Sequence, residues 1–181
     1  MTWLDNVTGR GKIRVEPLEW LPLEFLCFNM RAIDREEIVD NMDTDNPLEI
    51  AARLFHALSR VGCGWIGYLS GRPAATFGVY ENFPGNWHVF SFGTEDYARV
   101  LVACRENWDA MLAYALDRGM HRLECRSLAK HTEAHGFLRL LQFEKEAILE
   151  QYGRKRQDYI LFRRLWADNA KRDPGDHPTA L

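Results

Sequence analysis

Three short apolar runs separated by turn residues constrain the fold of this chain more than any other feature. They span residues 65–69, 75–80 and 87–92, and they are rich in the aromatic and β-branched side chains that favour strands. A Ser-Gly pair at 70–71 separates the first two runs, and a Phe-Pro-Gly-Asn segment at 83–86 separates the last two. The second segment places Pro and Gly at the two central positions of a type II turn. We therefore predict a meander of three antiparallel strands.

Helices and further strands surround this meander. The other expected elements are, in order, a strand at 12–16, helices over 23–30, from Asp34 and after the Asn46-Pro47 pair, a long helix from Thr94 to before Gly119, a strand at 121–126, a helix over about 130–141, and strands at about 143–149 and 158–165. Because strands and helices alternate after the meander, part of the sheet should be parallel and covered on both faces. The fold class is therefore α/β (α+β), with a mixed, mostly antiparallel sheet of about seven strands.

The expected long helix shows the clearest helical pattern. Thr94 is its predicted N-cap, with Glu95 and Asp96 in the first turn, and Gly119 supplies the stop. Its apolar stripe comprises Leu101, Cys104, Trp108, Met111, Leu112 and Ala115.

Length and composition indicate one domain. A chain of 181 residues with 46% hydrophobic content can bury one sizeable core, which we place at 12–166, between a flexible arm at 1–11 and a polar tail at 167–181. The net charge of −3 argues against general binding of nucleic acid or of a membrane surface. We expect neither a membrane span nor a signal peptide, and hence a cytoplasmic protein. We interpret the four cysteines as buried free thiols in a reducing compartment: Cys27, Cys63, Cys104 and Cys125.

The C-terminal half also contains a family-like motif. The superfamily in question often has N-x-x-A-x-x-F/L-Y-x-x-L-G-F, then acidic and basic residues, a Gly-centred loop and D-x-x-L/M-Y/F. The residues that fall into this frame are His131, Ala134, Phe137, Leu141, Phe143, Glu144, Gly153, Asp158, Leu161 and Phe162. With the order of elements, they make the chain resemble the GNAT N-acetyltransferase superfamily over about residues 12–165. Segments 123–129, 29–31 and 34–37 resemble a GNAT-like group found mainly in phages and prophages, which is similar to an internal virion protein of short-tailed phages.

Three departures from the superfamily pattern concern the binding of acyl-CoA. The pyrophosphate loop Q/R-x-x-G-x-G/A is absent, and residues 92–99 hold one glycine and two carboxylates in its place. Glycines in that loop let backbone N–H groups approach the diphosphate at a helix N-terminus, whereas Glu95 and Asp96 repel phosphate. The tyrosine that often protonates the departing thiolate corresponds to Leu138, and the glycine of L-G-F corresponds to Gln142.

The resemblance implies an acyl-CoA site, with acetyl-CoA or another acyl-CoA in the gap between the fourth and fifth strands. The predicted acyl-CoA-binding residues are Phe92, Gly93, Thr94 and Arg99. Arg99 is the one cation in the altered phosphate loop; its alternative role is that of an ordinary exposed helix residue.

Three histidines are candidate catalytic residues. His88 alternates with Phe90 and Phe92 on a strand that lines the cleft in GNAT enzymes, and an imidazole has a suitable intrinsic pKa to deprotonate an ammonium. The alternative is a hydrogen-bonded histidine in a sheet. His131 and His135 are four apart on a helix and are candidates for substrate contact, with a zinc pair or a solvated helix end as alternatives. No convincing third ligand is local, so we predict no metal.

Two carboxylates near the front of the chain are candidate substrate-binding residues. Asp34 and Glu37 lie three apart in a region that covers the acceptor site in the superfamily, where they can hold a cationic acceptor; they serve equally as first-turn acids of a helix. The aromatic strip of the meander is either sheet core or the lining of a pocket: Trp65, Tyr68, Phe77, Tyr80, Trp87 and Phe90.

Three functions remain open. The first is an acyltransferase, phage- or prophage-encoded, that moves an acyl group from acyl-CoA to a small-molecule or protein amine. The second is a non-catalytic GNAT-fold protein used in virion assembly or as a structural component, with other virion proteins as partners and a phage particle as its location. The third is a small-ligand binding module that retains the cleft without turnover. The sequence leaves the oligomeric state open, with a homo-oligomer among the alternatives.

Overall fold

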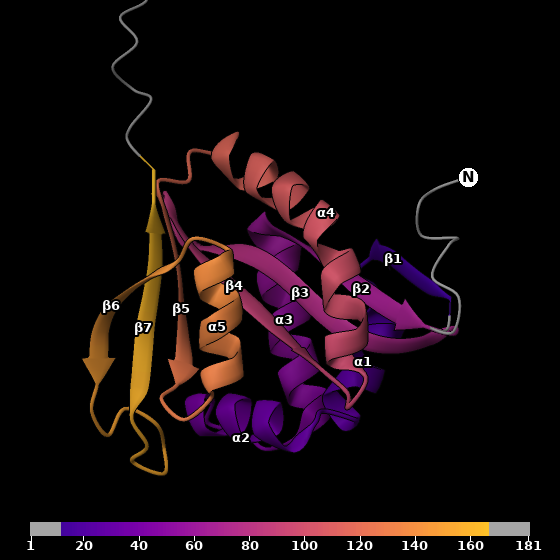
Figure 1. The fold of residues 1–181 in the computed structure, drawn as a ribbon, viewed down its shortest axis with the longest axis horizontal. Helices are drawn as coiled ribbons and strands as arrows, with labels where there is room; N and C mark the ends of the chain where they lie inside the picture. The colour runs from indigo at the N-terminus through magenta and orange to yellow at the C-terminus, as the bar shows by residue number, and fades with distance from the viewer. Residues whose placement is uncertain (1–11, 167–181) are drawn as a thin grey trace, which may run out of the picture.

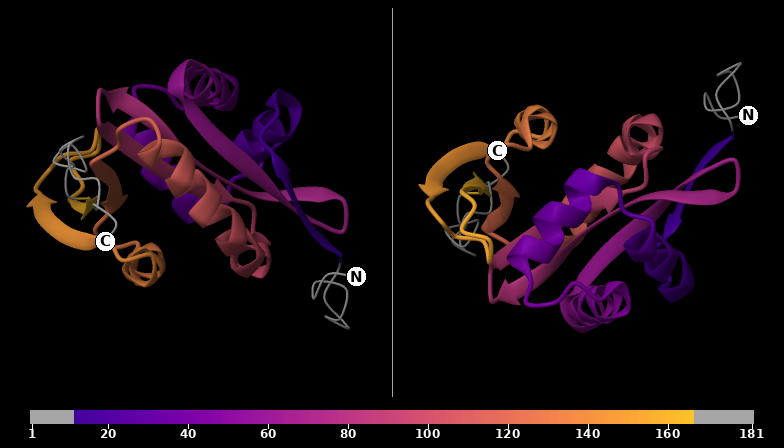
Figure 2. Two further views of the ribbon diagram at one scale, coloured as in Figure 1. Left: turned by 90° about the horizontal axis from the view of Figure 1, so that it is seen from above. Right: turned by 90° about the horizontal axis from the view of Figure 1, so that it is seen from below.

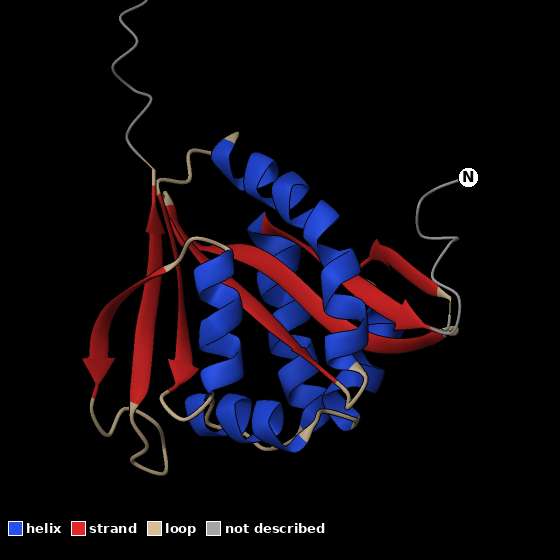
Figure 3. Ribbon diagram, in the orientation of Figure 1, coloured by secondary structure: helices blue, strands red, loops and turns tan. Residues whose placement is uncertain are grey.

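One seven-stranded sheet organises the part of the chain that the structure describes. A computed structural model describes residues 12–166, with the arrangement drawn in Figures 1 and 3. The strands are β1 (Ile13–Pro17), β2 (Gly62–Leu69), β3 (Arg72–Phe83), β4 (Asn86–Gly93), β5 (Arg122–Leu128), β6 (Glu144–Leu149) and β7 (Tyr159–Leu165). The helices are α1 (Trp20–Phe28), α2 (Ala32–Asn41), α3 (Pro47–Val61), α4 (Tyr97–Leu116) and α5 (Thr132–Leu140). The predicted arm at 1–11 and tail at 167–181 lie outside the described residues.

The strand order confirms the expected mixed sheet. The order is β1-β2-β3-β4-β5-β7-β6, in which β4 and β5 are parallel and every other pair is antiparallel. The meander is β2-β3-β4, with Val79 opposite Val89 in the second pair. Its second turn needs Gly85, whose φ of +81° lies in the left-handed region that type II turns require at this position.

Helices cover both faces of the sheet. Figure 2 shows α4 and α5 on one face and α1 and α3 on the other. On the α4 side, the core includes Trp87, Leu123 and Met111, all fully buried. On the α3 side, it includes Leu26, Ile50 and Ile66, also fully buried. The helical stripe predicted after Asn46 is confirmed, because Ile50 faces this core and the Asn46 side chain accepts a hydrogen bond from the Leu48 amide as an N-cap.

The start of α4 differs from the prediction. The helix begins at Tyr97, and Thr94, Glu95 and Asp96 all precede it. The Thr94 hydroxyl accepts a hydrogen bond from the Asp96 amide, and its carbonyl accepts one from the Tyr97 amide, so Thr94 closes a turn before the helix instead of capping it.

The end of α4 agrees with the prediction. Gly119 has a φ of +83°, and the Met120 amide bonds back to the Ala115 carbonyl in a Schellman-type stop.

The second helix, α2, takes a different place from the other four. It lies across the ends of the sheet strands, below the arrowhead of β5 in Figure 1. Its side chains contact the ends of β4 and β5 and the loop between β6 and β7. In residues 12–166 no helix is long and apolar enough to span a membrane.

Candidate functional site

The central parallel pair, β4 and β5, opens into a wedge. The two strands pair over only three positions, from Asn86 opposite Arg122 to His88 opposite Glu124. β4 continues to Gly93 along β3, and β5 continues along β7 to its own end at Leu128. Each strand therefore keeps its outer partner while the two inner edges separate. Alternate amides and carbonyls of a strand point to opposite sides, so the open stretch of β4 directs main-chain groups into the gap.

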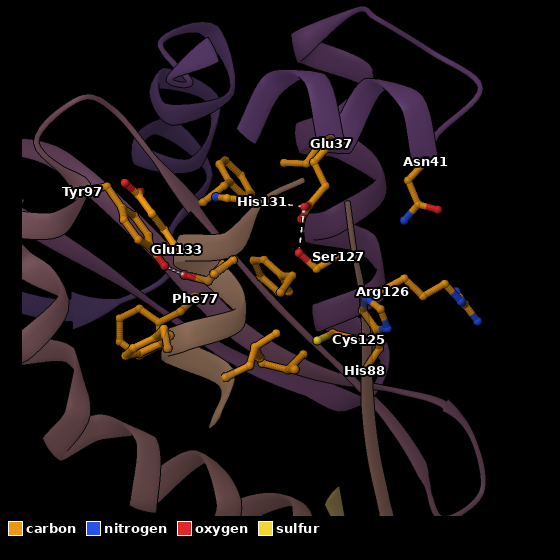
Figure 4. Close-up of a pocket in the computed structure, with 18 of the residues that line it drawn as sticks. Glu37, Asn41, Phe77, His88, Tyr97, Cys125, Arg126, Ser127, His131 and Glu133 are labelled. Carbon is orange, nitrogen blue, oxygen red and sulfur yellow. Dashed lines mark hydrogen bonds and ion pairs between the residues drawn. The ribbon is translucent and has the colours of Figure 1, made fainter. Parts of the chain in front are cut away.

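A cavity of about 450 Å³ lies at this wedge, and residues from both faces of the sheet line it. Figure 4 draws many of these lining side chains. The lining on the α4 and α5 side includes Val89, Ser91, Tyr97, Leu101, Trp108, Ala134, Phe137 and Leu138. The lining on the α2 and α3 side includes Ile38, Asn41, Met42, Leu54, Tyr80, His88, Phe90 and Phe92. Both alternatives for the aromatic strip therefore hold in part, because Phe77, Tyr80 and Phe90 line the cavity while Trp87 is fully buried core.

Helix α2 bridges the open ends of the two strands. At the β4 end, the Asp34 carboxylate accepts a hydrogen bond from the Gly93 amide at 2.9 Å. At the β5 end, the Glu37 carboxylate accepts bonds from the Leu128 amide at 2.7 Å and the Ser127 hydroxyl at 2.9 Å. One turn of α2 is thus hydrogen-bonded to the ends of both β4 and β5. The prediction that these two carboxylates hold a cationic acceptor stays a prediction, and both are occupied by neighbouring groups.

Arg31 lies at the mouth of the wedge, between the starts of α4 and α5. Its Nε donates to Asp34 at 2.8 Å, and its guanidinium carbon lies 4.4 Å from the centre of the Tyr97 ring. Its other nitrogens lie 3.5 Å from His131 and 3.7 Å from Glu133. Burial raises the pKa of Asp34, against the lowering effect of Arg31 and the Gly93 amide. Sequence reasoning did not select Arg31, and no local pattern distinguishes it.

The two helix histidines differ from the expected solvated helix end. His131 and His135 are 5% and 7% exposed, so that alternative is wrong. His131 lines the cavity, and its Nδ1 lies 3.1 Å from the Glu37 carboxylate. The Nε2 of His135 lies 3.1 Å from the Leu128 carbonyl, and its ring packs against Phe162. Burial lowers the pKa of His135. In the described part of the chain, no group of three or more His, Cys, Asp or Glu side chains has a metal-binding arrangement.

His88 lies in the cavity beside the point where the strands part. Its ring is 5.3 Å from the ring of Tyr80, and Figure 4 shows it next to Cys125 and Arg126. Burial, with a smaller contribution from the Arg126 charge, lowers the pKa of His88 to about 4. The intrinsic pKa used in the sequence prediction therefore does not hold in the fold. The imidazole is neutral at pH 7, but it is a weaker base than predicted.

Three main-chain amides at the loop between β4 and α4 already donate hydrogen bonds to acceptors within the protein. The Gly93 amide bonds to Asp34, the Thr94 amide to the Ala74 carbonyl and the Asp96 amide to the Thr94 hydroxyl. Gly93 is required here, because a Cβ at this position would overlap the Ala74 carbonyl oxygen and lie 3.0 Å from the Ala75 Cα. Among the residues predicted to bind acyl-CoA, Phe92 lines the cavity.

Arg99, the predicted phosphate contact, points elsewhere. It pairs with Asp96 at 2.7 Å, its side chain is half exposed, and it is not part of the cavity lining.

Arg126 is a cavity residue that the sequence reading did not select. It belongs to a cluster of three arginines and two glutamates on β5, β6 and β7: Arg122, Arg126, Arg163, Glu124 and Glu146. The missed signal was an arginine on a central strand of a sheet expected to be covered on both faces.

The cysteine thiols differ in how deeply they are buried. Cys27 and Cys125 are buried free thiols as predicted, whereas Cys63 is a free thiol that is only partly buried. Burial raises the pKa of Cys63 to about 11 and also raises that of Cys125, which lines the cavity. Cys125 therefore remains a protonated thiol at neutral pH. The side chain of Cys104 lies outside the described part of the structure.

Comparison with known proteins identifies the fold. No protein-family model and no curated protein matches this sequence. Several solved structures resemble this one, including the following three. A ribosomal-protein-alanine N-acetyltransferase from Brucella melitensis has a TM-score of 0.65 at 16% identity and covers 84% of this chain and 99% of its own. A GNAT-family acetyltransferase from Streptococcus pneumoniae has a TM-score of 0.59 at 16% identity, over 86% of this chain and 99% of its own. A ribosomal L7/L12 alpha-N-protein acetyltransferase in complex with coenzyme A has a TM-score of 0.63 at 11% identity, over 88% of this chain and 96% of its own. The chain therefore has the GNAT fold.

Proposed function

We propose that this protein transfers an acyl group from acyl-CoA to an amine within the wedge between β4 and β5. The observation that carries the proposal is the cavity of about 450 Å³ that crosses the sheet at the point where these strands part. Because side chains on both faces of the sheet line the cavity, an acyl donor can approach from the α4 and α5 side and an amine from the α2 and α3 side. The two reactants then meet beside the open edge of β4, whose amides are placed to hold a thioester carbonyl.

The residues on the donor side fit the pantetheine arm better than they fit the diphosphate. The cavity wall there is mostly apolar, with Leu101, Phe137 and Leu138 among its residues. At the mouth, the start of α4 is preceded by Glu95 and Asp96, and three amides of the loop are already bonded within the protein. Arg31 provides a cation close to the start of α4, where a phosphate group would lie. We therefore expect weaker donor binding than a glycine-rich loop would give.

The reaction needs few specific side chains. A neutral amine attacks the thioester carbonyl, the carbon–sulfur bond breaks, and the amine proton leaves to solvent while the CoA thiolate takes up a proton. His88 can accept a hydrogen bond from the amine and orient it, but a pKa of about 4 does not suit it to hold the proton. Leu138 cannot protonate the thiolate. We expect turnover to be limited by these two proton transfers.

A non-catalytic role is the second candidate, and one observation favours it. Asp34 occupies the Gly93 amide and Arg31 crosses the mouth of the wedge, so the protein's own side chains take up part of the donor site. The resemblance noted from the sequence makes this candidate a virion or assembly protein of phage or prophage origin. It predicts that the protein sediments with particles when phage lysates are fractionated, and its recovery only in the soluble fraction would argue against it.

Binding of acetyl-CoA separates the two candidates. Calorimetry and thermal unfolding with acetyl-CoA should both detect binding. At a ligand concentration of 100 times the Kd, the native state gains about 2.7 kcal/mol. For a domain of this size, that raises the Tm by roughly 5–11 °C. Release of free CoA thiol in the presence of an amine then measures turnover. Folded protein that shows neither heat nor a Tm shift at millimolar acetyl-CoA would contradict the proposed function.

A further inference from the structure

One cation on the acceptor side of the cavity has only a distant carboxylate partner. Four charged side chains line the cavity: Arg31, Glu37, Arg126 and Glu133. Arg31 and Glu133 lie 3.7 Å apart at the mouth beside α4 and α5, where Arg31 also pairs with the buried Asp34. Glu37 accepts hydrogen bonds from the Ser127 hydroxyl and the Leu128 amide, and it lies 3.1 Å from His131. The fourth charged side chain is Arg126.

Arg126 is the weakly held member of its cluster. Three arginines share two glutamates there, which leaves a net charge of +1. Arg122 takes the close contacts: its Nε bonds to Glu124 at 2.6 Å, and its terminal nitrogens bond to Glu146. Arg163 also pairs with Glu146, at 3.2 Å. Arg126 reaches Glu124 only at 3.5 Å, and its side chain is one-third exposed. We therefore assign the extra positive charge of the cluster to Arg126, whose guanidinium carbon also lies 5.6 Å from the centre of the Tyr152 ring.

The rest of this side of the cavity is apolar and aromatic. Figure 4 shows Arg126 and Asn41 on the same side of the pocket as His88. Behind them, the α2 and α3 side is lined by Ile38, Met42, Leu54, Tyr80, Phe90 and Phe92. A polycationic amine would lie next to the like charge of Arg126 here, and the Glu37 carboxylate already accepts hydrogen bonds from the Ser127 hydroxyl and the Leu128 amide. A ligand with an apolar body and a carboxylate fits both the wall and the cation.

Resting on the proposed function, we propose that the acceptor is a primary amine with an apolar body and a nearby carboxylate, the chemistry of a hydrophobic α-amino acid, and that Arg126 binds the carboxylate. The planar guanidinium suits a carboxylate in two-point geometry, and Asn41 supplies a further amide donor at the same mouth. Because the carboxylate lies on the cation, the amine is directed inward, toward His88 and the open edge of β4. This acceptor class differs from the cationic one expected from Asp34 and Glu37.

The test compares ligands that differ in one group. L-phenylalanine, phenethylamine (the same body without the carboxylate) and spermidine are titrated by calorimetry, each alone and in the presence of saturating CoA. We expect L-phenylalanine to bind roughly 10- to 100-fold more tightly than phenethylamine, the factor that a hydrogen-bonded charged group contributes. Spermidine should bind least.

Variants assign the difference to one side chain. Arg126→Gln should reduce the affinity for L-phenylalanine by roughly the same 10- to 100-fold and leave phenethylamine unchanged. Arg126→Lys keeps the charge without the planar fork and should retain part of the affinity. Arg118→Gln, an exposed arginine at the end of α4, is the matched control and should have no effect. Thermal unfolding of each variant verifies that it is folded.

Several outcomes would overturn the inference. They are equal binding of L-phenylalanine and phenethylamine, tighter binding of spermidine, no binding of any of the three with or without CoA, or an Arg126→Gln variant that binds like the wild type. Failure here is distinguishable from failure of the proposed function. Acyl transfer to other amines would leave the function and remove this acceptor class, whereas amino-acid binding without acyl transfer would leave the Arg126 site and remove the function.

Discussion

Replacement of Glu37 by alanine tests whether α2 holds the open ends of the wedge in place. One oxygen of this carboxylate accepts three hydrogen bonds, from the Leu128 amide, the Ser127 hydroxyl and the His131 ring. Hydrogen bonds to charged groups contribute about 1.5–3 kcal/mol each, and three bonds on one oxygen do not add fully. Ser127 and Leu128 are 3% and 1% exposed, so their donors would be left unpaired away from solvent.

We expect Glu37→Ala to lower the free energy of unfolding by about 3 kcal/mol. In a domain of this size, that corresponds to a fall in Tm of roughly 6–12 °C. Because the tie between α2 and the end of β5 is lost, the affinity for acetyl-CoA should fall as well. Glu37→Gln keeps one carbonyl oxygen as an acceptor and should fall between the alanine variant and the wild type.

Glu36→Ala is the matched control for this experiment. Glu36 neighbours Glu37 in the same helix, but it is partly exposed and its contacts are with Lys130 and Gln157 at the surface. Surface pairs of this kind contribute about 0–1 kcal/mol. Chemical and thermal unfolding of both variants gives the comparison. If Glu37→Ala is no less stable than Glu36→Ala, α2 does not anchor β5 through this carboxylate and the reasoning is refuted.

Two further predictions, tested with three variants, concern the environment of the site. The low pKa of His88 means that the unfolded chain, with an ordinary histidine pKa near 6.5, binds a proton more readily than the folded protein below that pH. The free energy of unfolding should therefore fall by about 2 kcal/mol between pH 7 and pH 5 through this residue. His88→Asn should remove that part of the pH dependence, which thermal unfolding at a series of pH values measures. If stability falls equally with pH in the variant and the wild type, burial does not lower the pKa of this imidazole. Gly93→Ala should destabilise the protein by about 1–3 kcal/mol, because the new methyl group meets the backbone of β3. Gly136→Ala, in α5 with open space around it, should stabilise it by about 0.5–1 kcal/mol, and a Gly93 variant as stable as the Gly136 variant would contradict the packing at the end of β4.

The local features of the fold could be predicted from the sequence. The meander follows from its residue types and from the turn at Gly85, and the end of α4 follows from Gly119, because these signals act within a few residues. The start of α4 was misplaced, since a threonine that closes a turn and a threonine that caps a helix have the same short-range chemistry.

The wedge and its ties could not be predicted in this way. The Asp34 and Glu37 carboxylates match the local pattern of first-turn acids, but their partners lie 59 and 91 residues away at Gly93 and Leu128. The same limit applies to His88, whose pKa depends on burial that only the assembled sheet creates. Arg126 is distinguished in the sequence only as an arginine on a central strand, and the role proposed for it depends on the pairing within its cluster.

The most direct test of the central claim is an NMR titration of the isotopically labelled protein with acetyl-CoA. We expect amide shifts to change chiefly at residues 89–93, 97–101 and 125–128, which border the wedge on β4, α4 and β5. Amides of β1 and of the β6 edge should stay unchanged, because those strands lie away from the gap. Saturable changes confined to the wedge would support acyl-CoA binding there. Saturable changes elsewhere on the sheet, or none at millimolar ligand, would contradict it.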